Sequence, residues 1–267
     1  MIAEDRLKAG DLDGALSALQ DQVRKNPADS KLRVFLFQLL AVTGDWNRAI
    51  TQLKVSAEMD ETATPMAQTY REGIICEVYR AKVFAGEKVP MIFGEPGDWV
   101  APLLEALKLQ AQGEHQAAAD LRGKAFEDAP TMSGTLNGQP FEWIADADMR
   151  LGPMLEMVVD GRYYWAPFTA IRSIIAEDPA DLRDAVWTPV TVKVAAGGEK
   201  VALIPTRYAG TAENGTPAQK LARETVWRDV GAETFVGTGQ RLLATDQGDT
   251  ALMELRELTM THPDADG

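Results

Sequence analysis

A six-residue pattern that returns after a fixed interval constrains this chain more than any other feature of its sequence. Residues 10–15 are Gly-Asp-Leu-Asp-Gly-Ala, and residues 44–49 are Gly-Asp-Trp-Asn-Arg-Ala, an offset of 34 positions. A third copy, Gly-Glu-His-Gln-Ala-Ala, occupies residues 113–118, two such intervals plus one residue further on. A period of 34 residues is that of the tetratricopeptide repeat, in which each unit is a pair of packed helices.

The residue types at particular positions of these copies are those that a helical hairpin requires. The leading glycine can end the first helix in a left-handed conformation that is costly for other residues, and the alanine at the sixth position lets the two helices approach closely. Pro27 and Pro130 each follow that alanine by twelve residues, and proline stops a helix. Residues 66–84 have apolar side chains at helical spacing, which predicts one longer, degenerate unit. The sequence therefore predicts an all-α, tetratricopeptide-like helical-repeat domain over residues 1–130.

After this domain the pattern changes to short apolar runs separated by turn signals. Residues 131–138 have the composition of a linker. Residues 154–159 and 162–165 flank Asp160-Gly161, a two-residue turn that matches the twist of a β-hairpin. Further predictions are a helix at residues 168–176, a second hairpin at 186–194 and 200–205, and strands at 223–230, 241–245 and 250–261. We predict a small, mainly antiparallel, β-rich α+β domain over residues 139–267, and hence a two-domain α+β protein.

The charge balance argues against several classes of partner. The chain has 27 Lys and Arg against 40 Asp and Glu, a net charge of −13. Nucleic-acid affinity depends on neutralising phosphates, and anionic membranes attract basic segments, so we expect neither as a partner. No apolar run is long enough to cross a membrane, and the first residues lack the pattern of a signal peptide. We therefore expect a cytoplasmic protein.

Few residues could serve metal or covalent chemistry. The two histidines, His115 and His262, are too few for a histidine-rich metal site and argue against a Ser-His-Asp arrangement. The sequence contains no Cys-x-x-Cys, no phosphate loop and no dinucleotide-binding glycine motif. Residues 237–241 are glycine-rich but lack the lysine and helix start of a phosphate cradle, so we interpret them as a turn between strands. We expect no metal, cofactor or small-molecule substrate.

One acidic cluster could carry chemistry. If residues 141–150 are helical, Glu142 and Asp146 lie one turn apart beside a tryptophan, and paired carboxylates can bind Mg²⁺ or act as acid and base. Arg150 would then stand four residues after Asp146 and neutralise it. We therefore favour a structural role and a non-enzymatic protein. The alternative is a carboxylate-dependent hydrolase that uses Glu142, Asp146 and Asp148.

Aromatic and arginine side chains supply the candidates for protein contact. Four of the six tryptophans lie in the second half with arginines nearby. We favour internal packing of these side chains, and the alternative is an exposed binding patch. In a tetratricopeptide stack the inner helices line a groove that holds another protein, unless the stack only packs on the second domain. The residues predicted to contact protein are Phe35, Phe37 and Trp46 in the repeats, and Trp143, Asp146, Asp148, Arg150, Trp165, Arg207 and Tyr208 in the second half.

Motifs spread along nearly the whole chain match a known pattern. Residues 143–153 are Trp-x-x-Asp-x-Asp-x-Arg-Leu-Gly-Pro. Further matches lie at residues 26–29, 32–40, 44–46, 164–167, 182–184, 187–189, 205–208 and 239–241. In these motifs the chain resembles the ImpE/SciE/TagJ family.

The resemblance implies a role in bacterial type VI secretion. Members of this family are cytoplasmic accessory proteins that contact the small subunit of the contractile sheath and are thought to help a ClpV-type ATPase engage and recycle it. The family implies no catalytic residue. The leading hypothesis is therefore a non-enzymatic adaptor whose short groove holds one helix of the small sheath subunit, with Phe35, Phe37 and Trp46 as anchors and the ATPase as a second partner.

Overall fold

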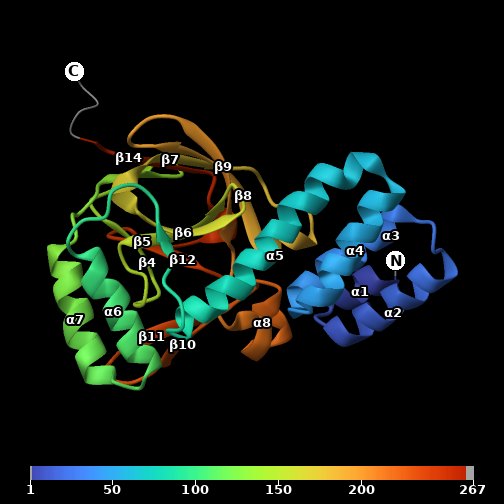
Figure 1. Cartoon of the computed structure of the whole chain (residues 1–267), viewed down its shortest axis with the longest axis horizontal. Coiled ribbons are helices and arrows are strands. Elements are labelled where there is room, and N and C mark those ends of the chain that lie inside the picture. The colour runs from blue at the N-terminus through green and yellow to red at the C-terminus, as the bar shows by residue number, and fades with distance from the viewer. Residues whose placement is uncertain (1, 263–267) are drawn as a thin grey trace.

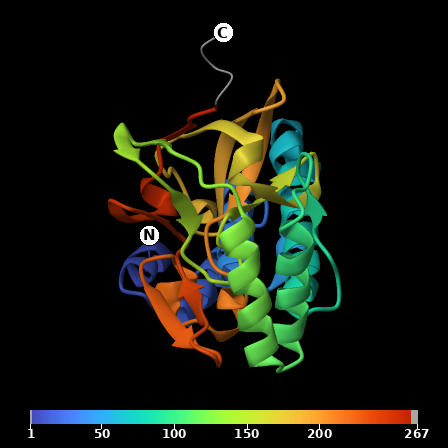
Figure 2. The same ribbon diagram turned by 90° about the vertical axis from the view of Figure 1, so that its left-hand side faces the viewer.

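The computed structural model describes residues 2–262, and residues 2–128 are mainly helical (Figure 1). The helices are α1 (Ile2–Lys8), α2 (Leu12–Lys25), α3 (Ser30–Thr43), α4 (Trp46–Met59), a short 3-10 turn η1 (Glu61–Ala63), the long α5 (Thr64–Phe84), and the pair α6 (Val100–Ala111) and α7 (His115–Asp128). The last two lie side by side (Figure 2). The predicted tetratricopeptide helical region is confirmed. Within the described part of the chain, no helix has both the length and the apolarity to cross a membrane.

The Gly-Asp pair of the repeat stops one helix and starts the next. Gly10 and Gly44 both have φ of 79°, the predicted left-handed conformation. Asp11 and Asp45 follow them, and each side chain accepts a hydrogen bond from the third backbone N–H of the next helix, at 2.9 and 3.4 Å. In the third copy Gly113 has φ of 85°, but the glutamate after it makes no side-chain cap.

A nine-stranded sheet forms the centre of the second half, with the strand order β1-β6-β5-β9-β8-β7-β14-β2-β3. All its neighbours are antiparallel except β1 and β6. Its strands are β1 (Met91–Ile92), β2 (Gly134–Leu136), β3 (Gln139–Phe141), β5 (Met154–Val159), β6 (Arg162–Pro167), β7 (Ile171–Ala176), β8 (Trp187–Val194), β9 (Glu199–Pro205) and β14 (Glu257–Met260). The predicted mainly antiparallel, β-rich second half is confirmed.

Two small sheets and several short helical turns complete this half. One sheet pairs β10 (Thr225–Asp229) with β11 (Phe235–Gly239). The other has the order β13 (Gly248–Ala251), β12 (Leu242–Thr245) and β4 (Ile144–Asp146). The turns are η2 (Phe168–Ala170), η3 (Leu182–Ala185), α8 (Thr211–Asn214), α9 (Pro217–Lys220) and η4 (Leu252–Glu254).

Both predicted hairpins are present. β5 and β6 pair through the turn Asp160-Gly161, whose φ values of 48° and 70° suit a two-residue hairpin turn. β8 and β9 pair around Gly197-Gly198. In each case the apolar run and its turn lie close together in the sequence, so local chemistry determines the pairing.

Several predicted elements are wrong, because long-range pairing outweighs local spacing. Residues 168–176 are η2 followed by β7 rather than a helix, since β8 and β14 pair with β7 on its two sides. Residues 250–261 are not one strand, because η4 separates β13 from β14. Residues 141–150 contain β4 and turns rather than a helix, and residues 237–239 lie within β11. Residues 131–138, predicted as a linker, contribute β2 to the large sheet.

The large sheet separates two hydrophobic cores. All six side chains of β5 are buried. Met154 and Val158 belong to the core that the sheet shares with the helices, whereas Leu155, Met157 and Val159 belong to a second core among the strands. Since the first core runs from α1 to the segment after α9, the two halves of the chain share it.

Two arginines of the second half of the chain cap the C-termini of helices in the first half. Arg207 donates a hydrogen bond to the carbonyl of Val42 at 2.8 Å, in the last turn of α3. Arg223 donates to the carbonyl of Leu7 at 3.0 Å, in the last turn of α1. Such carbonyls have no partner within their helix, and the helix C-terminus favours a positive charge. The second half therefore binds the repeats through their helix ends as well as through the shared core.

Candidate functional site

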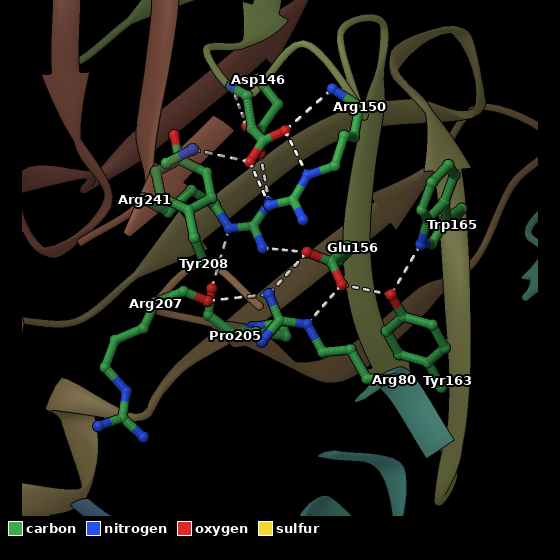
Figure 3. Close-up of polar contacts among 12 residues, drawn as sticks. Arg80, Asp146, Arg150, Glu156, Tyr163, Trp165, Pro205, Arg207, Tyr208 and Arg241 are labelled. Carbon is green, nitrogen blue, oxygen red and sulfur yellow. Dashed lines mark hydrogen bonds and ion pairs between the residues drawn. The ribbon is translucent and has the colours of Figure 1, made fainter. Parts of the chain in front are cut away.

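A buried carboxylate, Glu156 of β5, lies between the helices and the sheets (Figure 3). Arg80 of α5 donates to it twice, Nε to Oε1 at 2.6 Å and Nη2 to Oε2 at 2.9 Å. Arg241, just before β12, donates to the same Oε2, and the hydroxyl of Tyr163 donates to Oε1. None of these four side chains belongs to a residue more than 4% exposed. Both carboxylate oxygens of Glu156 therefore accept their hydrogen bonds from protein side chains.

The predicted carboxylates Asp146 and Asp148 extend this network. Asp146 accepts from Arg241 through Oδ2 and from the backbone N–H of Asp148 through Oδ1, the latter at 2.9 Å. Asp148 binds Arg150 with both oxygens, Oδ1 to Nε at 2.9 Å and Oδ2 to Nη2 at 2.5 Å. Asp148 Oδ2 also accepts from the backbone N–H of Gly237 at 3.0 Å. Because residues 141–150 are not helical, Arg150 neutralises Asp148 and Arg241 neutralises Asp146.

These contacts connect every layer of the second half to the helices. Arg80 comes from α5, Glu156 from the nine-stranded sheet, Asp146 from the three-stranded sheet, and Arg241 from the residue just before its strand β12. Gly237 lies in the two-stranded sheet. We call this set of residues, with Asp148, Arg150 and Tyr163, the buried ionic network. Its position indicates a structural role, since it joins the elements of the fold.

The environment moves the pKa values of the two central carboxyl groups in opposite directions. Burial alone would raise the pKa of Glu156, but Arg80 and Arg241 outweigh it and lower this pKa to about 2. Burial raises the pKa of Asp146 to about 7, although Arg241 opposes the rise. Two guanidinium groups therefore hold Glu156 ionised.

The carboxylates do not form the acid-and-base arrangement that the hydrolase alternative requires. Asp146 and Asp148 are 3% and 0% exposed, so a substrate cannot reach them. Glu142 is exposed and separate from them, and its backbone N–H donates to Asp246 at 2.7 Å. Among residues 2–262, no group of three His, Cys, Asp or Glu side chains is placed to hold a metal ion. The geometry of this cluster contradicts the predicted catalytic alternative.

The other predicted residues of the second half have different surroundings. Trp165 is fully buried and its indole N–H donates to the hydroxyl of Tyr163 at 2.7 Å. Tyr208 is 1% exposed and its ring lies 5.5 Å below the guanidinium of Arg241. Arg207 is 4% exposed and caps α3, while its carbonyl accepts from Arg80 at 2.9 Å. Trp143, by contrast, is 41% exposed.

The glycine-rich segment serves close packing. A Cβ atom on Gly237 would lie 2.2 Å from the ring of Tyr208, which no side chain could tolerate. Gly239 has φ of 103°, and a Cβ there would meet the carbonyl of Glu224. These glycines let β11 lie directly on Tyr208 beside the buried ionic network.

Two of the three predicted anchors in the repeats have partners inside the molecule. Phe37 is fully buried with its ring 5.7 Å from that of Tyr70. Trp46 is half-buried, and its ring lies 6.1 Å from that of Trp187. Phe35 is half-buried at the margin of the shared core. Phe35 and Trp46 are both partly exposed, and within residues 2–262 Phe35 makes no ring contact with another aromatic side chain.

The residues at the centre of the network were not among those predicted from the sequence. The sequence around Glu156 does indicate a buried charge, because Glu156 is a charged residue inside an otherwise apolar strand, and both faces of that strand are buried. Nothing in the sequence indicates that Arg80 is buried, since an arginine on a long helix normally lies at the protein surface. Arg241 was part of a recognised motif, but its two carboxylate partners lie 95 and 85 residues away in the chain.

The fold defines the class of this protein, a tetratricopeptide-repeat protein with a β-rich second half. A tetratricopeptide-repeat family matches residues 6–68, and the ImpE protein family matches residues 138–259. The type VI secretion system accessory component TagJ of Pseudomonas aeruginosa is 53% identical over 265 residues, which cover 99% of this chain and 93% of that protein. The chain therefore belongs to the ImpE family.

A solved structure supports the fold. The crystal structure of protein VPA1032 from Vibrio parahaemolyticus has a TM-score of 0.87 to this chain and covers 99% of both chains at 23% sequence identity. This likeness shows the shared fold of the whole chain, repeats and β-rich half together.

We predict that Glu156→Gln strongly destabilises the protein. The substitution leaves Arg80 and Arg241 without their shared anion in a buried site, and breaking a buried ion pair costs about 3 to 5 kcal/mol. Urea denaturation followed by circular dichroism measures this free energy of unfolding. The matched control Glu199→Gln, at the exposed start of β9, should change it by no more than about 0.5 kcal/mol. Equal, small effects of the two substitutions would show that the network contributes little.

The pKa of Glu156 also predicts a pH dependence. Because folding lowers this pKa from its ordinary value of 4.5 to about 2, the stabilisation is complete above pH 4.5 and is lost as the pH falls toward 2. The stability difference between the wild type and Glu156→Gln should therefore shrink by about 3 kcal/mol over that interval. Urea denaturation of both proteins at several pH values measures the difference, and one that grows on acidification would have the wrong sign.

Proposed function

We propose that this chain is a non-enzymatic adaptor of a type VI secretion system that holds the small subunit of the contractile sheath on its helical repeats. The full-length likeness to the Pseudomonas aeruginosa accessory component is the observation that carries this proposal. The repeat fold supports a protein ligand, because tetratricopeptide stacks bind other proteins through their helical surfaces. The buried, neutralised carboxylates support a role without catalysis.

The surface available for the partner is the N-terminal part of α3. Residues 36–42 of this helix are buried, and its C-terminus is capped by Arg207. Nearer the start of α3, Val34 and Phe35 are half-buried and Lys31 is exposed. These three residues share one face, since they are separated by three and four positions. A face this short suits one helix of the partner better than a long extended peptide.

A second partner follows from the same proposal. The family resemblance implies that sheath recycling involves a ClpV-type ATPase, and an adaptor bound to the small sheath subunit would present that subunit to the ATPase. The protein would then act in the cytoplasm, where sheath and ATPase meet.

We predict that Phe35→Ala weakens binding of the small sheath subunit at least tenfold, about 1.4 kcal/mol, because an aromatic anchor at the centre of an interface carries much of the binding energy. Purified full-length protein titrated with the purified sheath subunit in a calorimeter measures this. Trp143→Ala serves as the control, since Trp143 is an exposed aromatic residue of the other half. It should change the dissociation constant less than twofold, with both variants folded by circular dichroism.

Two results would contradict the proposal. If neither sheath subunit binds the folded wild type at micromolar concentration, the adaptor role fails. If the small subunit binds and only Trp143→Ala weakens it, the β-rich half rather than the repeats holds the partner.

A further inference from the structure

A hollow of about 410 Å³ lies beneath the β10–β11 hairpin. Val226, Arg228, Val236 and Thr238 line it from one face of the hairpin, where the register pairs Val226 with Thr238 and Arg228 with Val236. The segment that contains α8 and α9 lines it from the other side. In Figure 1, α8 and the hairpin lie at the same lower edge of the molecule.

The polar side chains around this hollow are mainly hydrogen-bond donors. Arg228 is exposed, and within residues 2–262 it has no ion pair or hydrogen bond through its side chain. Arg150 contributes to the wall while Asp148 and the ring of Phe84, 4.6 Å from its guanidinium, hold it in place. No acidic side chain lines the hollow in the described part of the chain.

Gln219 adds a donor from a rigid position. It is only 7% exposed, and its Oε1 accepts from the backbone N–H of Thr216 at 2.9 Å. That bond determines the orientation of the amide, so the Nε2 group is the free end. Nε2 has no hydrogen-bond partner among residues 2–262, and Gln219 lines the hollow. A nearly buried amide therefore offers N–H groups to whatever enters.

The local charge is positive although the protein is acidic. Arg150 and Arg228 are the two charged side chains that line the hollow, and Asp148 pairs with Arg150, so Arg228 is the uncompensated charge. Glu213 of α8 and Asp229 of β10 lie on the same segments, but neither side chain lines the hollow. The charges at the hollow thus decide which ligand it favours, and they favour an anion.

The hairpin also offers an apolar wall and a free strand edge. Val226 is 48% exposed beside Arg228. In residues 2–262, β10 pairs with β11 and with no other strand, so its outer edge presents unpaired backbone groups. An extended peptide can add to such an edge and place alternate side chains over one face of the hairpin.

We propose that this hollow binds a side-chain carboxylate of an extended, acidic segment of another protein, which pairs with the edge of β10. Arg228 is the principal ionic contact, Gln219 and Arg150 donate the accompanying hydrogen bonds, and Val226 packs against the aliphatic part of the segment. The site lies in the β-rich half and is separate from the repeat surface proposed for the sheath subunit. This proposal is therefore independent of the proposed sheath contact.

Isothermal titration calorimetry with the full-length protein tests this site. The probe is an acetylated, amidated octapeptide that alternates glutamate with threonine, and the matched probe has glutamine in place of glutamate. We expect the glutamate peptide to bind, with a dissociation constant at least tenfold higher for Arg228→Gln. Arg172→Gln, which removes an exposed charge from β7, should change it less than twofold. The glutamine peptide should bind at least tenfold more weakly than the glutamate peptide.

Three outcomes would overturn the proposal. They are no heat of binding at millimolar glutamate peptide, equal weakening by Arg228→Gln and Arg172→Gln, and equal affinity for the two peptides. Displacement of the peptide by an equal concentration of inorganic phosphate would also overturn it, because it would show that the hollow selects a small anion and not an extended acidic segment.

Discussion

The carboxylate of Glu156, held between Arg80 and Arg241, is the contact on which the rest of this structure depends. It joins α5 to the large sheet and, through Arg241 and Asp146, joins both to the three-stranded sheet. The net contribution of a buried ion pair to stability is small when compared with well-packed apolar residues, but losing one partner is costly. The network therefore penalises any arrangement in which these layers are displaced, because displacement would leave buried charges unpaired.

Three of the motifs that carry the family resemblance contribute residues to this scaffold. Asp146, Asp148 and Arg150 come from one motif, and Arg207 and Arg241 from two others. All five are engaged inside the molecule, in ion pairs or, for Arg207, on the carbonyls of α3. These three motifs thus support the fold, whereas the motif at residues 32–40 contains Phe35, and Arg150 also lines the hollow beneath the β10–β11 hairpin.

What could be predicted from the sequence was local in origin. The repeat was predictable because its glycine and aspartate act on adjacent helix ends, and the two hairpins because turn and strands are contiguous. Strand β7 was mistaken for a helix, because its neighbours β8 and β14 decide its conformation and β14 lies about 80 residues later in the chain. The network could not be predicted, since Arg80 and Glu156 are 76 residues apart and no local pattern pairs them.

The shared core, the helix-capping arginines and the buried ionic network should make the helical half and the β-rich half one cooperative unit. Native-state hydrogen exchange followed by mass spectrometry tests this most directly, by comparing the opening free energies of amides in α3 and in β5. The account predicts that the most protected amides of both elements open with the same free energy, equal to that of global unfolding. A clearly lower opening free energy for all amides of α3, with β5 still protected, would show that the repeats unfold independently and would contradict it.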